Sequence, residues 1–177
     1  PRTVGDGQDI YRGSLPIAEA FDRIECLYKP YHRALSRQLT TSHRRYGFAL
    51  LVDCHSMPSA AVTRSESYRC DIVIGDRFGT SADPDIPDRI EAYLRNCGYQ
   101  VARNRPYAGG FITEHHGAPA TGIHALQIEV NRALYMDERR MERLPNFERL
   151  RMDLAGMAHD LADLVSDFIR PECLAAE

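Results

Sequence analysis

Phe48-Ala-Leu-Leu-Val52 is a short apolar run that leads directly into Asp53-Cys-His-Ser56. An apolar run of this length is typical of a buried strand, and polar residues that follow it lie at its carboxyl end. Cys70-Asp-Ile-Val-Ile74 is followed by Gly-Asp in the same manner. We therefore predict buried, central strands at both positions, with chemically useful side chains at their ends.

The segments around these strands alternate between helical and extended patterns. Apolar positions recur every three or four residues from Leu15 to about Arg45, which predicts a helix that Pro30 kinks or splits. The same patterns predict helices at 86–96 and 150–169 and strands at 99–103 and 123–130. We therefore expect an α/β fold with a mostly parallel or mixed sheet flanked by helices, in one domain over residues 1–177 that a loop at 1–14 enters.

Composition excludes several classes of function. The 177 residues suit one globular domain, and the formal net charge of -3 comes with no concentrated basic face, so nucleic acid is not an expected partner. No apolar stretch approaches the roughly 20 residues of a membrane helix, and no signal pattern opens the chain. We expect no membrane partner and a cytoplasmic location.

The five cysteines are widely spaced and form no C-x-x-C pair, which indicates neither a disulfide framework nor a four-cysteine zinc site. We expect most of them to be buried thiols and Cys54 to pack inward. His55 is unsuited to activate Cys54, because successive strand side chains point to opposite faces. A thiol mechanism would need another base, for which the candidates are His115, His116 and His124.

His55 is the first candidate for function, because an imidazole at the end of a strand is well placed to hold a metal or to move a proton. The alternative is a histidine that only caps the loop by hydrogen bonding. Ligands of open α/β sheets bind beyond the carboxyl ends of the strands, which raises the odds of the functional interpretation without excluding the other.

Glu129 is the second candidate. Alternation in His124-Ala-Leu-Gln-Ile-Glu-Val-Asn-Arg132 places Gln127, Glu129 and Asn131 on one face of a strand. A carboxylate in a buried strand is unfavourable unless it is paired or used. Glu129 would form an ion pair with Arg132 or Arg105, or it would act as a general base that takes a proton from water.

The third candidate is the segment Arg103-Asn-Arg-Pro-Tyr-Ala-Gly-Gly110, which combines guanidinium groups, a phenol and a flexible diglycine. Such a loop suits a dicarboxylate, since guanidinium groups bind carboxylates in bidentate fashion. It also suits an ordinary tight turn, and the Gly-Gly pair lacks the spacing of a nucleotide-binding motif. His115-His116 is expected on a strand, where the two rings diverge and form no site.

Together these segments resemble the N-formylglutamate amidohydrolase family, also called N-formylglutamate deformylases. Several motifs in the correct order are far more specific than any one of them, and they cover nearly the whole chain. The motifs are Pro1-Arg2, Asp9-Ile-Tyr11, Tyr31-His32, Asp53-Cys-His-Ser-Met-Pro58, Asp71-Ile-Val-Ile-Gly-Asp76, Asn104-Arg-Pro-Tyr-Ala-Gly-Gly110, His124-Ala-Leu-Gln-Ile-Glu-Val-Asn-Arg132 and Leu134-Tyr-Met136.

The resemblance implies a fold related to zinc carboxypeptidases and aspartoacylases. It also implies a Zn²⁺ ion whose activated water attacks the formyl group of N-formyl-L-glutamate, in histidine degradation. His55 matches a metal-binding histidine, and Glu129 matches the general base that then protonates the leaving amine. The expected contacts to the substrate carboxylates or the oxyanion come from Arg105, Tyr107 and Arg132, with Asn104 orienting them.

The remaining metal ligands of the family, an early histidine and an acidic residue, are expected upstream of Pro1, so that the N-terminal part of the family domain is missing. Catalytic zinc usually takes three protein ligands, and the matching motifs supply one. Two alternatives therefore stay open: a deacylase for another N-acyl amino acid, and a truncated, non-catalytic fragment that binds a partner chain. The expected partner is a small-molecule substrate, and the oligomeric state is open.

Overall fold

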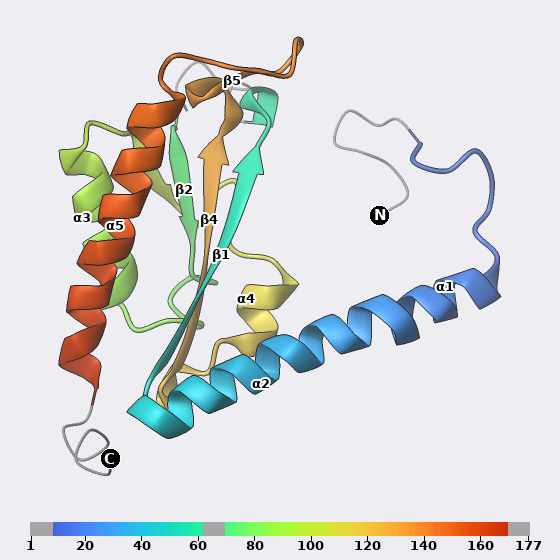
Figure 1. The fold of residues 1–177 in the computed structure, drawn as a ribbon, viewed down its shortest axis with the longest axis horizontal. Helices are drawn as coiled ribbons and strands as arrows, with labels where there is room; N and C mark the ends of the chain where they lie inside the picture. The colour runs from blue at the N-terminus through green and yellow to red at the C-terminus, as the bar shows by residue number, and fades with distance from the viewer. Residues whose placement is uncertain (1–8, 62–69, 170–177) are drawn as a thin grey trace. The chain divides into compact units, whose positions relative to one another are not determined.

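The computed structural model describes residues 9–61 and 70–169 (Figure 1). Contacts within the chain separate it into two compact units, Pro1–Gln38 and Leu39–Glu177. The Pro1-Arg2 motif and the first part of the predicted loop at 1–14 lie outside the described residues, and residues 9–14 form no helix. Among the described helices, none combines the length and the apolar character that crossing a membrane requires.

The predicted N-terminal helix is continuous, and Pro30 does not split it. Helical backbone runs through α1 (Ile17–Arg23), a π-helical segment (Ile24–Tyr28) and α2 (Lys29–Tyr46). A proline ring crowds the carbonyl group four residues earlier, and a wider π turn directly before Pro30 accommodates it. Within the first unit the apolar stripe of this helix is exposed, as at Ile17 and Phe21, whereas Leu39 in the second unit is buried.

A four-stranded sheet organises the second unit, in the order β1-β4-β2-β3. Its strands are β1 (Ala49–Met57), β2 (Ile72–Gly75), β3 (Val101–Arg103) and β4 (Ile123–Asn131). The β1–β4 and β2–β3 pairs are parallel and the β2–β4 pair is antiparallel, which confirms a mixed, mostly parallel sheet flanked by helices. Within the described sheet β1 is an edge strand, so its predicted central position is wrong, and β4 is central.

The main core lies on one face of the sheet, under α3 (Asp85–Asn96) and α5 (Phe147–Phe168). Figure 1 shows the two helices side by side on that face, with α4 (Phe111–His116) on the other. Ile74, Leu126 and Ile128 are almost fully buried beneath α3 and α5. Burying each such side chain contributes roughly 1.5–3 kcal/mol, so this face stabilises the unit.

The opposite face of the sheet carries a smaller hydrophobic cluster than the face under α3 and α5. A small cluster of Met57, Cys70 and Val73 lies there, with Tyr107 packed against it. The helix α4 contacts β4 and β1. The remaining elements are the short strands β5 (Met136–Asp137) and β6 (Glu142–Arg143) and 3-10 turns at Ser59–Ala61, Pro119–Thr121 and Arg132–Leu134.

Candidate functional site

The strands β1 and β4 bring His55 and Glu129 together. The two strands are parallel, and their register pairs His55 with Glu129 and Asp53 with Gln127. Paired residues on neighbouring strands share a face, and the strands lie about 4.8 Å apart. All four side chains therefore lie on the face opposite α3 and α5. His55 is inside β1 rather than after it, because β1 pairs with β4 as far as Met57.

Asp53 orients the imidazole of His55. Its Oδ1 lies 3.0 Å from His55 Nε2, and the His55 side chain is 47% exposed. When Nε2 carries the proton and donates it to the carboxylate, Nδ1 keeps its lone pair. His55 can thus offer Nδ1 to a cation or to a proton. Asp53 lies two residues before His55, so strand alternation was the signal that could have identified it.

Glu129 is a buried carboxylate without an ion pair among the described residues. It is 7% exposed, and its hydrogen bond comes from Gln127 Nε2 to Oε1 at 2.6 Å. Of the two alternatives for Glu129, an ion pair with Arg132 or Arg105 is therefore not formed among the described residues. Burial raises the pKa of Glu129 above its ordinary value, against the opposing effects of the Gln127 hydrogen bond and the charges of His55 and Arg132. A carboxylate with a raised pKa is a stronger base than a free one.

Arg132 stands at the carboxyl ends of the two strands. Its Nε donates to Ser56 Oγ at 3.1 Å and its Nη2 to the Ser56 carbonyl oxygen at 3.3 Å. These bonds hold the guanidinium group near enough to Glu129 for its charge to oppose, without reversing, the rise in the pKa of that carboxyl group. The structure therefore places one positive charge at the same edge of the sheet as His55 and Glu129.

The loop from Asn104 to Gly110 reaches this face from the opposite edge of the sheet. β2 and β3 run antiparallel to β4, so the loop starts beside the other end of β4 and returns across the face. Tyr107 packs against the cluster that includes Val73, the residue that pairs with Glu129. Gly110 N–H donates to Gln127 Oε1 at 2.6 Å. Arg105 lies on the same loop and is exposed.

Asn104 has a structural position rather than one beside Glu129. Its Nδ2 donates to Asp76 Oδ1 at 2.6 Å, and its Oδ1 accepts from the backbone N–H groups of Asp76 and Phe78. Arg103 donates to the other oxygen of Asp76 at 2.7 Å. Three of the four hydrogen-bonding positions of the Asn104 amide are thus used to shape the turn after β2. The predicted role of Asn104 in orienting the substrate-binding groups stays a prediction, and one amide hydrogen is left for it.

The structure does not assemble a cysteine nucleophile around Cys54. Cys54 is exposed, so the expectation that it packs inward is wrong; of the other described cysteines, Cys70 is buried, Cys97 is half-buried and Cys26 is exposed. Cys54 stands on the α5 side of an edge strand, where no further strand of the described sheet covers it. Partial burial, together with the charge of Asp53, raises its pKa, which disfavours the thiolate.

The histidines proposed as bases for Cys54 lie elsewhere. His124 pairs with Leu50, four residues before Cys54 along β1, and it accepts a hydrogen bond from Asp83 N–H. His115 and His116 belong to α4 rather than to a strand, so their predicted position is wrong, and their rings meet edge to face at 4.8 Å. A short helix forms there because Gly109 and Gly110 turn the chain directly before it.

The described residues do not form a complete zinc site. In residues 9–61 and 70–169 no group of three histidine, cysteine, aspartate or glutamate side chains is placed to hold a metal ion. His55 fits the role of one ligand through Nδ1, but Asp53 is bound to its imidazole and Glu129 to Gln127. Catalytic zinc normally takes three protein ligands, so the expected Zn²⁺ stays a prediction.

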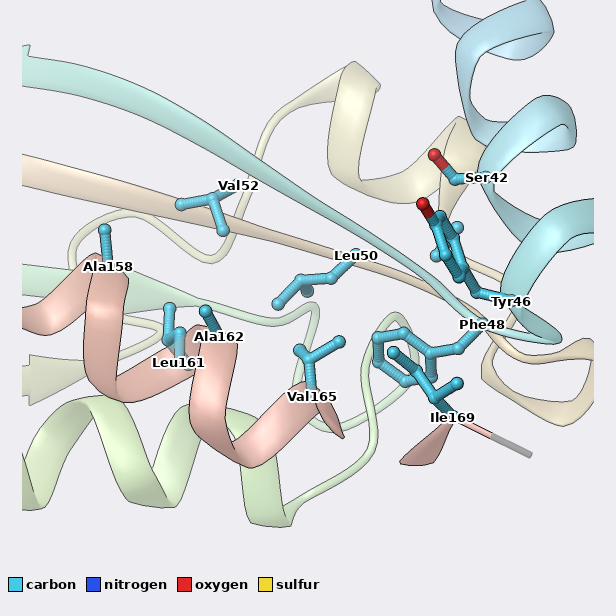
Figure 2. A pocket seen from close by; sticks show the side chains of 11 residues that line it. Ser42, Tyr46, Phe48, Leu50, Val52, Ala158, Leu161, Ala162, Val165 and Ile169 are labelled. Atoms are coloured by element: carbon cyan, nitrogen blue, oxygen red, sulfur yellow. The ribbon is translucent and has the colours of Figure 1, made fainter. Parts of the chain in front are cut away.

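Two hollows lie along β1 on the side of α5. The first has a volume of about 330 Å³ and is lined mainly by apolar side chains of β1 and α5, with Tyr46 and Ser42 from α2 (Figure 2). Its described lining includes no carboxylate or imidazole, so it does not carry acid–base chemistry. The second, of about 390 Å³, lies at the carboxyl end of β1 and is bordered by Cys54, His55 and Arg151.

Comparisons with known proteins agree with this arrangement. Residues 1–136 match the family model described as N-formylglutamate amidohydrolase. The chain is 36% identical over 141 residues to N-formylglutamate deformylase of Pseudomonas aeruginosa and 34% identical to that of Pseudomonas putida. Each match covers 78% of this chain and 53% of the relative, so the chain spans about half the length of these relatives.

A solved structure extends the likeness to the fold. The crystal structure of N-formylglutamate amidohydrolase from Ralstonia eutropha superposes with a TM-score of 0.87 at 37% identity, over 95% of this chain and 61% of that one. The structure of a gene product from Agrobacterium tumefaciens, at 20% identity and a TM-score of 0.63, shares the fold alone. Sequence and fold agree, and this chain belongs to the N-formylglutamate amidohydrolase family.

Proposed function

We propose that this chain carries the general base and part of the substrate site of an enzyme that hydrolyses N-formyl-L-glutamate to formate and L-glutamate. The observation that carries the proposal is the register of β1 and β4, which places the imidazole of His55 beside the buried carboxylate of Glu129. The relatives named N-formylglutamate deformylase support the substrate.

Amide hydrolysis needs a base that activates water and an acid that protonates the departing amine. Glu129 is suited to both steps, because its raised pKa makes the carboxylate more basic and its protonated form more accessible near neutral pH. It takes the proton from the attacking water and gives it to the amine nitrogen as the C–N bond breaks. Burial of Glu129 also limits its exchange of that proton with bulk water.

N-formylglutamate carries two carboxylates, which calls for cationic groups near the base. Arg132 is held by Ser56 at the carboxyl edge of β1 and β4, and Arg105 and Tyr107 belong to the loop that crosses the face. We assign these three side chains to the substrate carboxylates and the oxyanion, since guanidinium groups bind carboxylates in bidentate fashion.

The proposal includes a zinc ion only as an expectation, and such an ion would need more ligands than His55. His55 would be one of its ligands, and because residues 9–61 and 70–169 hold no group of three suitable side chains, at least one more would come from residues outside those described. The role in histidine degradation follows from the proposed substrate, and a cytoplasmic location is proposed with it.

The test is formate release from N-formyl-L-glutamate, with N-acetyl-L-glutamate and N-formylglycine as competing substrates, accompanied by zinc analysis. The proposal predicts turnover that prefers the formylated dicarboxylate and disappears in Glu129→Gln but not in Glu142→Gln, which changes an exposed glutamate. Preference for N-acetylglutamate would instead support the broader deacylase. Binding of N-formylglutamate without turnover, by this chain and by a longer natural form, would support a non-catalytic binding protein.

A further inference from the structure

We propose that Gln127 is a positioning residue that holds Oε1 of Glu129 and thereby leaves Oε2 as the oxygen that exchanges protons in the reaction. The inference rests on the proposed role of Glu129 as general base. The strand pattern alone places Gln127 on the same face as Glu129 and gives it no role, whereas this inference does.

A chain of two short hydrogen bonds carries the inference. Gly110 N–H donates to Gln127 Oε1 at 2.6 Å, and Gln127 Nε2 donates to Glu129 Oε1 at 2.6 Å. Gln127 and Glu129 are 6% and 7% exposed, so water has little access to the bond between them, whereas Gly110 itself is exposed. A donor bound to a carboxylate makes a charge-assisted hydrogen bond, which is stronger than a neutral one.

The direction of the Gln127 amide is determined by Gly110. A backbone N–H group only donates, so the amide must present its oxygen to Gly110 and its NH₂ group to Glu129. If the amide were rotated by half a turn, its NH₂ group would meet the Gly110 N–H and its oxygen would meet the Glu129 carboxylate. Neither contact could form a hydrogen bond. A leucine of similar size would satisfy neither neighbour, and an unsatisfied buried polar group costs roughly 1–3 kcal/mol.

The position of Gly110 is itself restricted by close backbone packing. A Cβ atom on Gly75 would lie 2.4 Å from Gly109 N, so β2 and the loop approach more closely than any side chain permits. Gly109 has φ +104°, and a Cβ there would lie 3.0 Å from Thr113. The close packing of the loop therefore fixes the position of the Gly110 N–H group. Gln127 is held by that group and in turn holds the Glu129 carboxylate.

Within the described part of the chain, Oε1 is the only oxygen of Glu129 that receives a hydrogen bond. Oε2 is then the oxygen available to a water molecule and to the departing amine. Loss of Gln127 would let the carboxylate rotate about its side-chain bonds, which reduces the fraction of molecules in reactive geometry. The expected defect is thus in turnover rather than in substrate binding.

The kinetic test compares Gln127→Leu with Gln100→Leu, a matched change at an exposed glutamine, in formate release from N-formyl-L-glutamate. We expect Gln127→Leu to lower kcat by about 10–100-fold, as is typical when a supporting hydrogen bond behind a reactive group is removed, with KM within about threefold of wild type. A kcat within threefold of wild type, or a loss confined to KM, overturns the proposal. Gln100→Leu should match wild type in both constants.

A second measurement tests the hydrogen bonds in the wild-type chain, in case Gln127→Leu does not fold. The side-chain amide of Gln127 is followed by ¹⁵N–¹H NMR, and we expect slow proton exchange that Glu129→Leu abolishes. Fast exchange in the wild type overturns the proposal. Absence of formate release from N-formylglutamate both by this chain and by a longer natural form refutes the proposed function, whereas an active wild type with unchanged Gln127→Leu refutes the positioning role alone.

Discussion

Replacing Glu129 by glutamine removes one buried charge while keeping the shape of the side chain, so activity and stability should move in opposite directions. The new amide oxygen can still accept the hydrogen bond from Gln127 Nε2, which spans 2.6 Å in the wild type. The packing around β4 is therefore preserved, and the change isolates the proton chemistry of one residue.

The activity loss follows from the role of a general base. Such groups typically contribute about 10²–10⁴-fold to rate. At 1.36 kcal/mol for each tenfold change, this corresponds to about 2.7–5.5 kcal/mol of transition-state stabilisation. We expect Glu129→Gln to lower kcat for formate release by that factor, with little change in KM.

The stability gain follows from the pKa of Glu129, which burial raises above the ordinary value of 4.5. The folded state then holds the proton more tightly than the unfolded state, so ionisation destabilises the fold at pH values above the raised pKa. Glutamine cannot ionise and avoids that cost. The variant should be more stable than wild type at pH 8, and the difference should vanish as the pH falls below about 4.5.

The assay pairs formate release with urea unfolding at pH 8 and pH 4, with Glu142→Gln as the exposed control. Glu142→Gln should change neither quantity. The reasoning is refuted if Glu129→Gln keeps more than about a tenth of wild-type activity. A variant that is less stable than wild type at pH 8 would contradict the electrostatic argument separately.

Three further predictions address the pH dependence and the frame of the site. Formate release by the wild type should decline as the pH falls through the raised pKa of Glu129, so the acid limb of kcat against pH should lie above 4.5; a limb at or below 4.5 would contradict the burial effect. Asp76→Ala should cost about 1–3 kcal/mol in urea unfolding, because it removes the acceptor of Asn104 Nδ2 and leaves Arg103 paired with Asp88 and Glu91 only. Burial alone would raise the pKa of Asp76, but the bonds from Asn104 and Arg103 outweigh it and lower that pKa, so the wild-type advantage should be full above about pH 4 and should be lost as the pH falls through the lowered pKa. Gly75→Ala should destabilise the chain by about 1–3 kcal/mol, because its Cβ would lie 2.4 Å from Gly109 N, whereas Gly13→Ala, which meets nothing within 4 Å, should be neutral in thermal unfolding.

Local patterns identified most elements of the second unit. The apolar run at Phe48, the alternation around Glu129 and the helical spacing before Gly98 correspond to β1, β4 and α3. Sequence patterns were less informative where the same residues are compatible with two backbone conformations. His115 and His116 were assigned to a strand, but the chain forms the short helix α4 there. Pro30 predicts a helix that is kinked or split, but the helix continues through a π-helical segment directly before it.

The candidate site was predicted in part. His55 and Glu129 were recognised from their residue types and their strands, and Gln127 was placed on the face of Glu129 without a task. The motif suggests that Asn104 orients the substrate-binding groups, and it does not show that the Asn104 amide also shapes the turn around Asp76. Sequence does not show which of several nearby polar groups a short side chain will meet, because that choice depends on how strands pair.

The sequence by itself determined which residues share a face of a strand, since alternation of side chains is a property of the local backbone. That is why Gln127 and Glu129 could be placed together before any fold was known. Only the tertiary structure decided that His55 stands opposite Glu129, and that the loop after β3 returns across the sheet to Gly110. Strand order, direction and register depend on pairing between distant segments, whose free energy is summed over the whole sheet rather than carried by any one motif.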